Sequence, residues 1–324
     1  MTLATRGLTV AYSRAGKLAL RDVTLEVPAG RILAVVGPSG AGKTTLLRAV
    51  AGLLPIRSGD VLLGDRSLCG LPPQVRRIAV VFQDDALFPN MTVRANLEFA
   101  QRGRRAGSPA LAVQNAATAL HVADRLARRP RELSGGERQR AAIARALVSQ
   151  PAALLMDEPL AHLDPSLRRA VRDEVLGVRQ RFEGPILYVT HDHEEAMSVG
   201  DQLAVLIDGR IEDAGAPQRV YDSPRSLAVA RFLGDRPMNV LSGAPAIAIR
   251  PEHVRLARDA ALRGRVVQRE PAGADAYLRV STPRGEMVVR VGAAQEAAIG
   301  DDVGLDLPDE HVRRFDEATG AAVG

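Results

Sequence analysis

The sequence "RILAVVGPSGAGKTTLLRAV" (residues 31–50) contains three structural signals in a row. Residues 31–36 are a short, continuous apolar run, which is typical of a buried strand. A glycine-rich loop follows at 37–42, and Leu46 and Val50 then have the spacing of one helix face. A strand, a glycine-rich loop and a helix in this order predict a nucleotide-binding α/β unit.

Residues 37–44 fit the phosphate-loop pattern G-x-x-x-x-G-K-[ST]. The glycines of the pattern are Gly37, Gly40 and Gly42. Glycine lets backbone N–H groups approach phosphate oxygens, and the following helix presents its positive end to the same anion. Lys43 adds a positive charge, and the Thr44 hydroxyl is a ligand for Mg²⁺. The pattern therefore predicts a site for nucleotide phosphates with Mg²⁺.

Two further buried strands are predicted at 152–157 and 185–191, and each ends in polar residues. Ligands of open parallel sheets collect at the carboxyl ends of strands. Asp157 at the first end can hold Mg²⁺, and Glu158 can orient or deprotonate the attacking water. His191 at the second end is placed to contact a terminal phosphate.

Three segments have both a structural and a functional interpretation. Gln83 follows a predicted strand at 77–82, so it is either a polar loop residue or part of the same polar edge. Tyr12 is either a core aromatic or a surface for stacking on adenine. The segment "HDHE" (191–194) is alternatively a His-x-His metal site. The phosphate loop favours the nucleotide interpretation of each.

A second phosphate-facing loop is predicted within "RELSGGERQR" (131–140). Ser134, Gly135 and Gly136 open a predicted helix that runs through Leu147. The structural interpretation is a simple helix cap. However, two glycines after a serine also leave backbone N–H groups at a helix N-terminus with no side chains to cover them, and anions bind at such a position.

The composition indicates a globular protein. The 324 residues are 46% hydrophobic, which is enough for two domains, or for one large and one small domain. The net charge is +5, but aromatic residues make up 3% and Trp is absent, so platforms for base stacking are scarce and we expect no nucleic-acid partner. Cys69 is the single cysteine, which excludes an internal disulfide. No apolar run approaches the length of about 18 residues that would cross a membrane.

The sequence pattern changes near Pro237, where short alternating strands begin. We place a boundary at 236–241, between a nucleotide-binding domain at 1–236 and a small barrel of the oligonucleotide/oligosaccharide-binding (OB) type at 237–324. The predicted barrel strands are 246–250, 264–267, 276–280, 286–291 and 303–307. Within the first domain, residues 91–149 lose the strand pattern and are predicted to be mostly helical.

Together, these segments resemble the ATP-binding subunit of ABC transporters over residues 1 to about 236. The motifs are Walker A "GPSGAGKTT" (37–45), Q-loop "VFQDDALFP" (81–89), signature "LSGGERQR" (133–140), Walker B "LLMDEP" (154–159), D-loop "LAHLD" (160–164) and His switch "VTHD" (189–192). The signature is the specific motif, because other phosphate-loop ATPases lack it. The resemblance implies a P-loop α/β fold with a parallel core sheet, an antiparallel β subdomain and a helical subdomain.

The resemblance implies ATP and Mg²⁺ as ligands and gives each site residue a role. The implied phosphate-binding residues are Gly37, Ser39, Gly40, Gly42, Lys43, Thr44 and Thr45. The implied Mg²⁺ ligands are Thr44, Gln83 and Asp157. Glu158 is the implied general base, His191 contacts the γ-phosphate, and Tyr12 stacks on adenine.

In this family two such subunits bind head to tail, which explains two phosphate-facing loops in one chain. Ser134, Gly135 and Gly136 then contact the γ-phosphate of the ATP held by Lys43 of a second copy or a close paralogue. Asp164 links the two sites, and a monomer hydrolyses ATP poorly. Glu137 departs from the usual Gln of the signature, which weakens contacts near the ribose.

The resemblance also implies partners. Residues after Gln83, through Phe88 and Pro89, line the groove for the coupling helix of an integral membrane subunit. An importer contains two such subunits and an extracytoplasmic solute-binding protein, and its ATPase is peripheral on the cytoplasmic face of the membrane. The accessory barrel favours an importer over an exporter.

The cargo class is inferred from the C-terminal part. The segment "FLGDRPMNVL" (232–241) resembles sugar and glycerol-phosphate importers of the maltose type. Only "SGAPA" separates Leu241 from Ile247, so the barrel looks trimmed. The segment "LFPNMTV" (87–93) is also seen in anion, iron and polyamine importers, which stay as alternatives. A soluble ABC ATPase of DNA repair or translation is a further alternative, but the chain has one Walker A loop and no long coiled coil.

Overall fold

The computed structural model describes residues 1–12, 16–83, 87–101, 109–161 and 164–323. The chain forms two compact units, Met1–Pro217 and Gln218–Gly324. The segment 236–241, where the sequence pattern changes, lies in the second unit, at the beginning of its strand-rich part. None of the described helices is long and apolar enough to span a membrane.

The first unit is built on a six-stranded sheet with the order β10-β9-β3-β8-β7-β6. The strands are β3 (Ile32–Val36), β6 (Ile78–Val81), β7 (Ala153–Asp157), β8 (Ile186–Val189), β9 (Gln202–Ile207) and β10 (Arg210–Gly215). All are parallel except β10, which forms a hairpin with β9. Strands β3, β7 and β8 are buried at every position, which explains their continuous apolar sequences.

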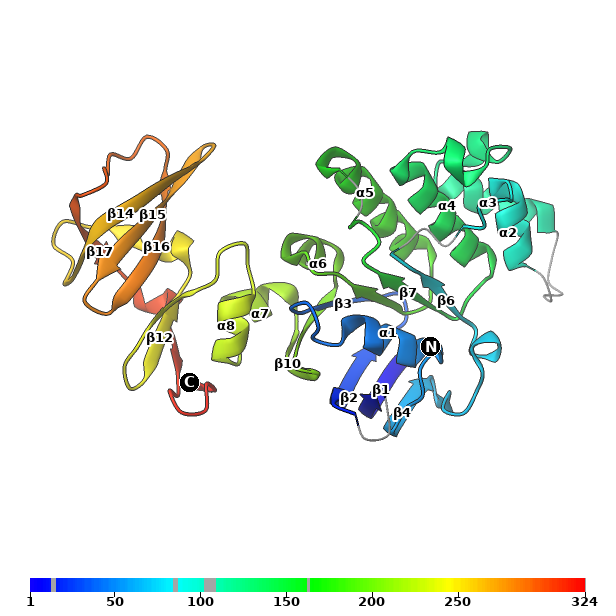
Figure 1. Ribbon diagram of the computed structural model, residues 1–324, viewed down its shortest axis with the longest axis horizontal. Coiled ribbons are helices and arrows are strands. Elements are labelled where there is room, and N and C mark those ends of the chain that lie inside the picture. The colour runs from blue at the N-terminus through cyan, green and yellow to red at the C-terminus, as the bar shows by residue number, and fades with distance from the viewer. Residues whose placement is uncertain (13–15, 84–86, 102–108, 162–163, 324) are drawn as a thin grey trace. The chain divides into compact units, whose positions relative to one another are not determined.

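A second, antiparallel sheet has the order β2-β1-β4-β5. Its strands are β1 (Leu3–Ala11), β2 (Leu18–Val27), β4 (Ser58–Leu63) and β5 (Arg66–Ser67). Helix α1 (Lys43–Ala51) lies between this sheet and the parallel sheet (Figure 1). Leu46 and Val50 of α1 pack with Leu8 of β1 and Leu155 of β7, as their helical spacing predicted.

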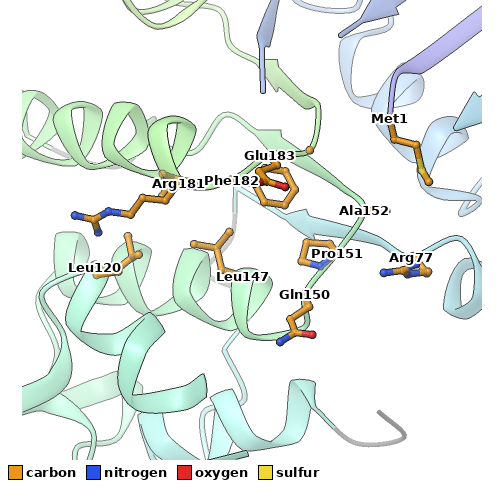
Figure 2. A pocket seen from close by; sticks show the side chains of 13 residues that line it. Met1, Arg77, Leu120, Leu147, Gln150, Pro151, Ala152, Arg181, Phe182 and Glu183 are labelled. Atoms are coloured by element: carbon orange, nitrogen blue, oxygen red, sulfur yellow. The ribbon is translucent and has the colours of Figure 1, made fainter. Parts of the chain in front are cut away.

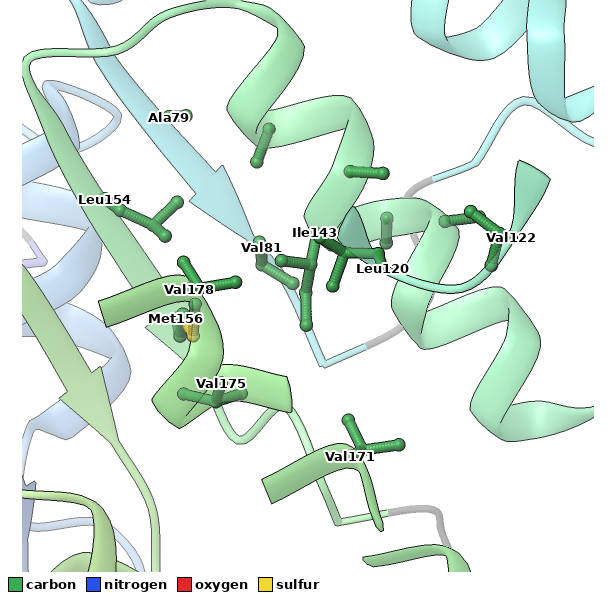
Figure 3. Packing of buried hydrophobic residues seen from close by; sticks show 14 of the residues in the cluster. Ala79, Val81, Leu120, Val122, Ile143, Leu154, Met156, Val171, Val175 and Val178 are labelled. Atoms are coloured by element: carbon green, nitrogen blue, oxygen red, sulfur yellow. The ribbon is translucent and has the colours of Figure 1, made fainter. Parts of the chain in front are cut away.

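The other face of the parallel sheet is covered by helices. The α-helices of this part are α2 (Val93–Ala100), α3 (Pro109–Ala119), α4 (Gly135–Val148), α5 (Pro165–Arg181) and α6 (His193–Val199). Short 3₁₀ helices are η1 (Pro73–Val75), η2 (Ala123–Arg125) and η3 (Pro130–Glu132). Ile143 of α4 packs with Val81 of β6, Met156 of β7 and Val175 of α5 (Figure 3). The prediction of a mostly helical segment at 91–149 is confirmed for its described residues.

The second unit has two short helices followed by strands. Helices α7 (Pro217–Asp222) and α8 (Leu227–Phe232) begin it, and η4 (Pro251–His253) and η5 (Asp309–His311) are single 3₁₀ turns. One sheet contains β11 (Asn239–Leu241), β12 (Ala246–Ile249), β18 (Arg313–Phe315) and β19 (Ala322–Val323). The other contains β13 (Arg255–Leu256), β17 (Asp302–Asp306), β14 (Leu262–Ala272), β15 (Asp275–Thr282) and β16 (Gly285–Gly292).

One side chain joins the two sheets of the second unit. Asn239 of β11 donates to the Val288 carbonyl at 2.8 Å and accepts from the Val288 N–H at 2.6 Å. The amide thus pairs with β16 as a neighbouring strand would. Every predicted C-terminal strand is present, and the expectation of a small OB-like, strand-rich domain is confirmed. Among the described residues, the hydrogen-bonded strands of this unit form two separate open sheets.

Candidate active site

The strand order gathers most of the predicted site residues at one edge of the parallel sheet. Strands β3, β8, β7 and β6 are consecutive and parallel, so their carboxyl ends are neighbours. The phosphate loop follows β3, His191 follows β8, Asp157 ends β7 with Glu158 directly after it, and Gln83 follows β6. The sequence predicted each of these strand ends, but not the order that places β8 between the phosphate loop and Asp157.

The phosphate loop has its shape because two of its glycines lie against backbone. A Cβ at Gly37 would lie 2.1 Å from the carbonyl oxygen of Leu206 in β9. Gly42 has a φ of 108°, and a Cβ there would lie 2.6 Å from the carbonyl oxygen of Ala19 in β2. Neither position therefore accepts a side chain without movement of the backbone. The loop is a bare-backbone cradle before a helix N-terminus, which fits a phosphate group.

Lys43 lies across this loop. Its side chain is largely buried, and Nζ donates to the carbonyl oxygens of Gly37 at 2.7 Å and Pro38 at 3.2 Å. Burial lowers the pKa of Lys43, and the nearby carboxylates of Glu158 and Asp157 oppose that shift. An anion that entered the loop would meet an ammonium group already held in place.

Thr44 and Asp157 form a pair of oxygen ligands. The Thr44 hydroxyl donates to Asp157 Oδ1 at 3.4 Å, and the Asp157 side chain is almost fully buried. Burial raises the pKa of Asp157, and the neighbouring charge of Glu158 raises it further. A divalent cation would offset the cost of this buried charge, and hydroxyl and carboxylate oxygens are the ligands that Mg²⁺ prefers. These residues therefore fit Mg²⁺.

Glu158 and His191 are in direct contact. Glu158 Oε2 lies 2.9 Å from His191 Nδ1. The Glu158 backbone has a φ of 45° and its N–H donates to the Val189 carbonyl at 2.8 Å, which fixes the direction of the side chain. A carboxylate held at this edge can orient a water molecule or accept its proton.

Tyr12 reaches the same helix from the antiparallel sheet. Its hydroxyl lies 2.6 Å from the Thr45 hydroxyl of α1, and its side chain is 67% exposed. Tyr12 is therefore not a core residue. Gln83 is exposed after β6, and residues 84–86 of its loop lie outside the described residues.

The signature segment is an N-cap with both halves of a capping box. The Ser134 hydroxyl accepts from the Glu137 N–H at 3.3 Å, and Glu137 Oε2 accepts from the Ser134 N–H at 2.8 Å. A Cβ at Gly136 would lie 3.1 Å from Leu167 of α5. Ser134 is exposed, Gly135 is half-buried and Gly136 is buried.

Glu137 has a second partner that sequence reasoning missed. Its Oε1 accepts from Arg125 Nε at 2.7 Å. The hydrogen bond from Arg125, assisted by the Ser134 N–H, lowers the pKa of Glu137. The sequence distance of 12 residues gave no signal for this pair, because the intervening segment is irregular.

Asp164 and Phe88, which the sequence predicts to contact partner subunits, lie near segments outside the described residues. Asp164 Oδ1 accepts from the Leu167 N–H at 3.0 Å at the start of α5, while residues 162–163 of the D-loop lie outside the described residues. The Phe88 ring is 40% exposed and packs edge-on against Phe99, with 4.9 Å between ring centres. The guanidinium of Arg145 lies 5.6 Å from the centre of the Phe88 ring.

A separate apolar pocket of about 560 Å³ lies at the opposite edge of the parallel sheet (Figure 2). It is lined by residues that precede strands, among them Arg77 before β6, Ala152 before β7 and Gly184 before β8. The pocket is therefore not part of the nucleotide edge. The described residues contain no group of three or more His, Cys, Asp and Glu side chains that could hold a metal.

Comparison with known proteins identifies the family. Residues 20–161 match the ABC transporter family, and residues 247–315 match the TOBE domain family. The chain is 39% identical to an ATP-binding protein of Brucella abortus, over 97% of both chains. The chain belongs to the ATP-binding proteins of ABC transporters. It is an ATPase that binds ATP.

Two further relatives extend the comparison for this ABC ATPase. The sn-glycerol-3-phosphate import ATP-binding protein UgpC of Rhizobium meliloti is 40% identical over 93% of this chain and 94% of its own. The solved structure of cbiO1 from Clostridium perfringens, described as part of the ABC transporter complex cbiONQ, has a TM-score of 0.63 and 27% identity. That match covers 68% of this chain and 90% of cbiO1.

Proposed function

We propose that this ABC ATPase hydrolyses ATP with Mg²⁺ to power import of glycerol 3-phosphate or a related carbohydrate. The observation that carries the proposal is the likeness to UgpC of Rhizobium meliloti, which spans nearly the whole chain, the accessory domain included. The segment 232–241 supports the same cargo class. Inorganic anions, iron and polyamines are the alternative cargoes.

In this proposal each residue of the sheet edge has one task. Lys43 and the amides of 40–45 bind the β- and γ-phosphates, with Gly37 shaping the loop. Thr44, Asp157 and Gln83 hold Mg²⁺, which supplies charge neutralisation for the phosphates when bound. Glu158 accepts the proton of the attacking water, His191 holds the γ-phosphate, and Tyr12 stacks on adenine.

The second half of each site comes from a second copy or a close paralogue. Ser134 is exposed at the N-terminus of α4, and its cap orients the amides of Gly135 and Gly136. We infer that these amides bind the γ-phosphate of ATP on the partner. Asp164, at the start of α5, then connects the two sites across the dimer.

The remaining partners are two integral membrane subunits and an extracytoplasmic solute-binding protein. Phe88 supports a docking groove, because an aromatic ring that stays 40% exposed while packed on Phe99 offers a rigid apolar surface. Through this contact the chain would be peripheral on the cytoplasmic face of the membrane.

The test is a pull-down of tagged Glu158→Gln protein from its own membranes with ATP, followed by mass spectrometry. Two membrane subunits and a solute-binding protein are expected, and Lys43→Ala protein under the same conditions is the control. The recovered binding protein is then titrated with glycerol 3-phosphate, sugars, anions, iron and polyamines. Recovery of soluble DNA-repair or ribosomal factors alone would contradict the proposal.

A further inference from the structure

A buried polar cluster lies beside the turn that carries His191. Glu195 of α6 is 5% exposed, between Tyr188 of β8 and Thr190 after it, which are both almost completely buried. The Tyr188 hydroxyl donates to Glu195 Oε1, and the Thr190 hydroxyl donates to Oε2 at 3.0 Å. Because both donors point at one carboxyl group, the cluster fits an ionised Glu195.

An ionised Glu195 carboxylate is energetically unfavourable at this buried position. Burial raises the pKa of Glu195, and the two hydroxyl hydrogen bonds oppose the shift without a direct ionic partner. No described Lys, Arg or His forms an ion pair with Glu195. An apolar residue would fill the same place without this cost, so packing alone does not account for a carboxylate here.

The cluster is part of a ring of hydrogen bonds that joins Glu195 to the turn carrying His191. The Thr190 hydroxyl accepts from the Asp192 N–H at 3.1 Å, and Asp192 Oδ1 accepts from the Glu195 N–H at 2.9 Å. Glu195 therefore bonds directly to both chain neighbours of His191, to Thr190 through its carboxylate and to Asp192 through its backbone N–H. The ring leaves the imidazole outside, 59% exposed and in contact with Glu158.

The ring is also tied to the rest of the unit on both sides. The Thr190 N–H donates to the Val35 carbonyl of β3 at 3.2 Å, next to the phosphate loop. Asp192 Oδ2 forms an ion pair with Arg168 of α5 at 3.3 Å. The turn at 190–192 thus cannot shift without breaking bonds to β3, α5 or α6.

We propose that Glu195 is a positioning residue for ATP hydrolysis, whose buried carboxylate holds the turn 190–192 so that His191 stays against Glu158. The inference rests on the proposed roles of those two residues. Because a displacement of about 1 Å in a catalytic group can cost up to about 100-fold in rate, loss of this support should lower turnover more than ATP binding.

The first experiment measures kcat and KM for ATP in full-length Glu195→Gln protein. Glu194→Gln is the matched control, since it makes the same chemical change one residue earlier on an exposed side chain. For Glu195→Gln we expect kcat to fall about 10-fold with KM changed less than about twofold. Glu194→Gln should match the wild type.

The second experiment observes His191 itself by ¹⁵N NMR of the histidine rings. The chain has six histidines, so His191→Gln assigns the resonances by their disappearance. We expect Glu195→Gln to shift both ring-nitrogen resonances of His191, since its contact with Glu158 loosens, and Glu194→Gln to leave them in place. A structural role alone would lower the unfolding temperature without moving these resonances.

Tyr188→Phe is the second variant if Glu195→Gln does not fold, because it removes one donor and leaves the carboxylate in place. It should lower kcat about threefold and shift the same resonances. Wild-type kcat or unmoved His191 resonances in the folded variants would overturn the inference. Wild-type activity in His191→Gln would instead show that the proposed role of His191 is wrong.

Discussion

His191 Nδ1 lies 2.9 Å from Glu158 Oε2, although 33 residues separate them in the chain. The parallel pairing of β7 and β8 places Asp157 opposite Val189, so the two polar ends are neighbours. The Glu158 side chain is 18% exposed, whereas that of His191 is 59% exposed. The carboxylate is therefore shielded and fixed, and the imidazole is the group that reaches outward.

Glu158→Gln should reduce ATP turnover by about 10²–10⁴-fold, because the amide keeps the shape of the side chain but cannot accept a proton. ATP binding should survive, so the variant accumulates as an ATP-bound dimer. Light scattering with and without ATP measures this. Glu183→Gln, at the exposed opposite edge of the sheet, is the control. No rise in mass with ATP would argue against the dimer.

Lys43→Ala should weaken ATP binding about 10–100-fold, the effect of losing a charged hydrogen-bond donor. Lys17 is the only other lysine of the chain and is exposed, so Lys17→Ala is a natural control with the same change in net charge. Titration with a fluorescent ATP analogue measures both. Equal affinities in the two variants would contradict the phosphate-binding role of Lys43.

The sequence predicted where the polar strand ends lie because a buried parallel strand appears in the sequence as a continuous apolar run. These runs stop at Asp157, His191 and Gln83. It could not predict the sheet order, which depends on packing between distant elements. Alternating residues of β7 show why. Leu154 and Met156 pack on the side of α4 and α5, whereas Leu155 packs on the side of α1. Both faces are equally apolar, so the sequence alone assigns neither.

Ser134→Arg should stop hydrolysis and leave ATP binding unchanged, because the large side chain fills the exposed space before α4 without touching the phosphate loop of its own chain. Ser134→Ala separates the loss of the cap, worth about 1 kcal/mol, from this steric effect. ATPase assays and fluorescent-nucleotide titration distinguish the two. A collapse of ATP affinity in Ser134→Arg would show that the serine acts on its own nucleotide.

Glu137→Gln restores the residue usual in this family and should change turnover less than about threefold, because glutamine can still accept from the Ser134 N–H. It removes the charge that Arg125 contacts. The pKa of Glu137 is lowered in the fold, so its stabilisation is present above the ordinary pKa of about 4.3 and is lost as the pH falls through the folded value.

Thermal unfolding of the wild type and Glu137→Gln at a series of pH values tests this. The wild type should unfold at the higher temperature near neutral pH, and the two curves should converge in acid as the pH falls through the lowered pKa of Glu137. A difference that grows on acidification would mean that the Arg125 contact is not the source of the stability.

The cluster around Glu195 was outside what the sequence predicted, although one signal was present. Asp192 followed three residues later by Glu195 is the spacing of a helix cap, whereas the sequence interpretation assigned Asp192 to the His switch (189–192) or a possible metal segment (191–194) and left Glu195 out of both. The cap is real, with Asp192 Oδ1 accepting from the Glu195 N–H. That the same glutamate turns inward to Tyr188 depends on how α6 packs back on the sheet, which only the folded chain shows.

The bonds from Lys43 to the carbonyl oxygens of Gly37 and Pro38 have a kinetic consequence. These bonds tie the ammonium group to the loop itself, so phosphate binding would exchange one set of partners for another and order little new chain. Association should then be governed by encounter more than by slow rearrangement, and the lifetime of the bound nucleotide should set its affinity.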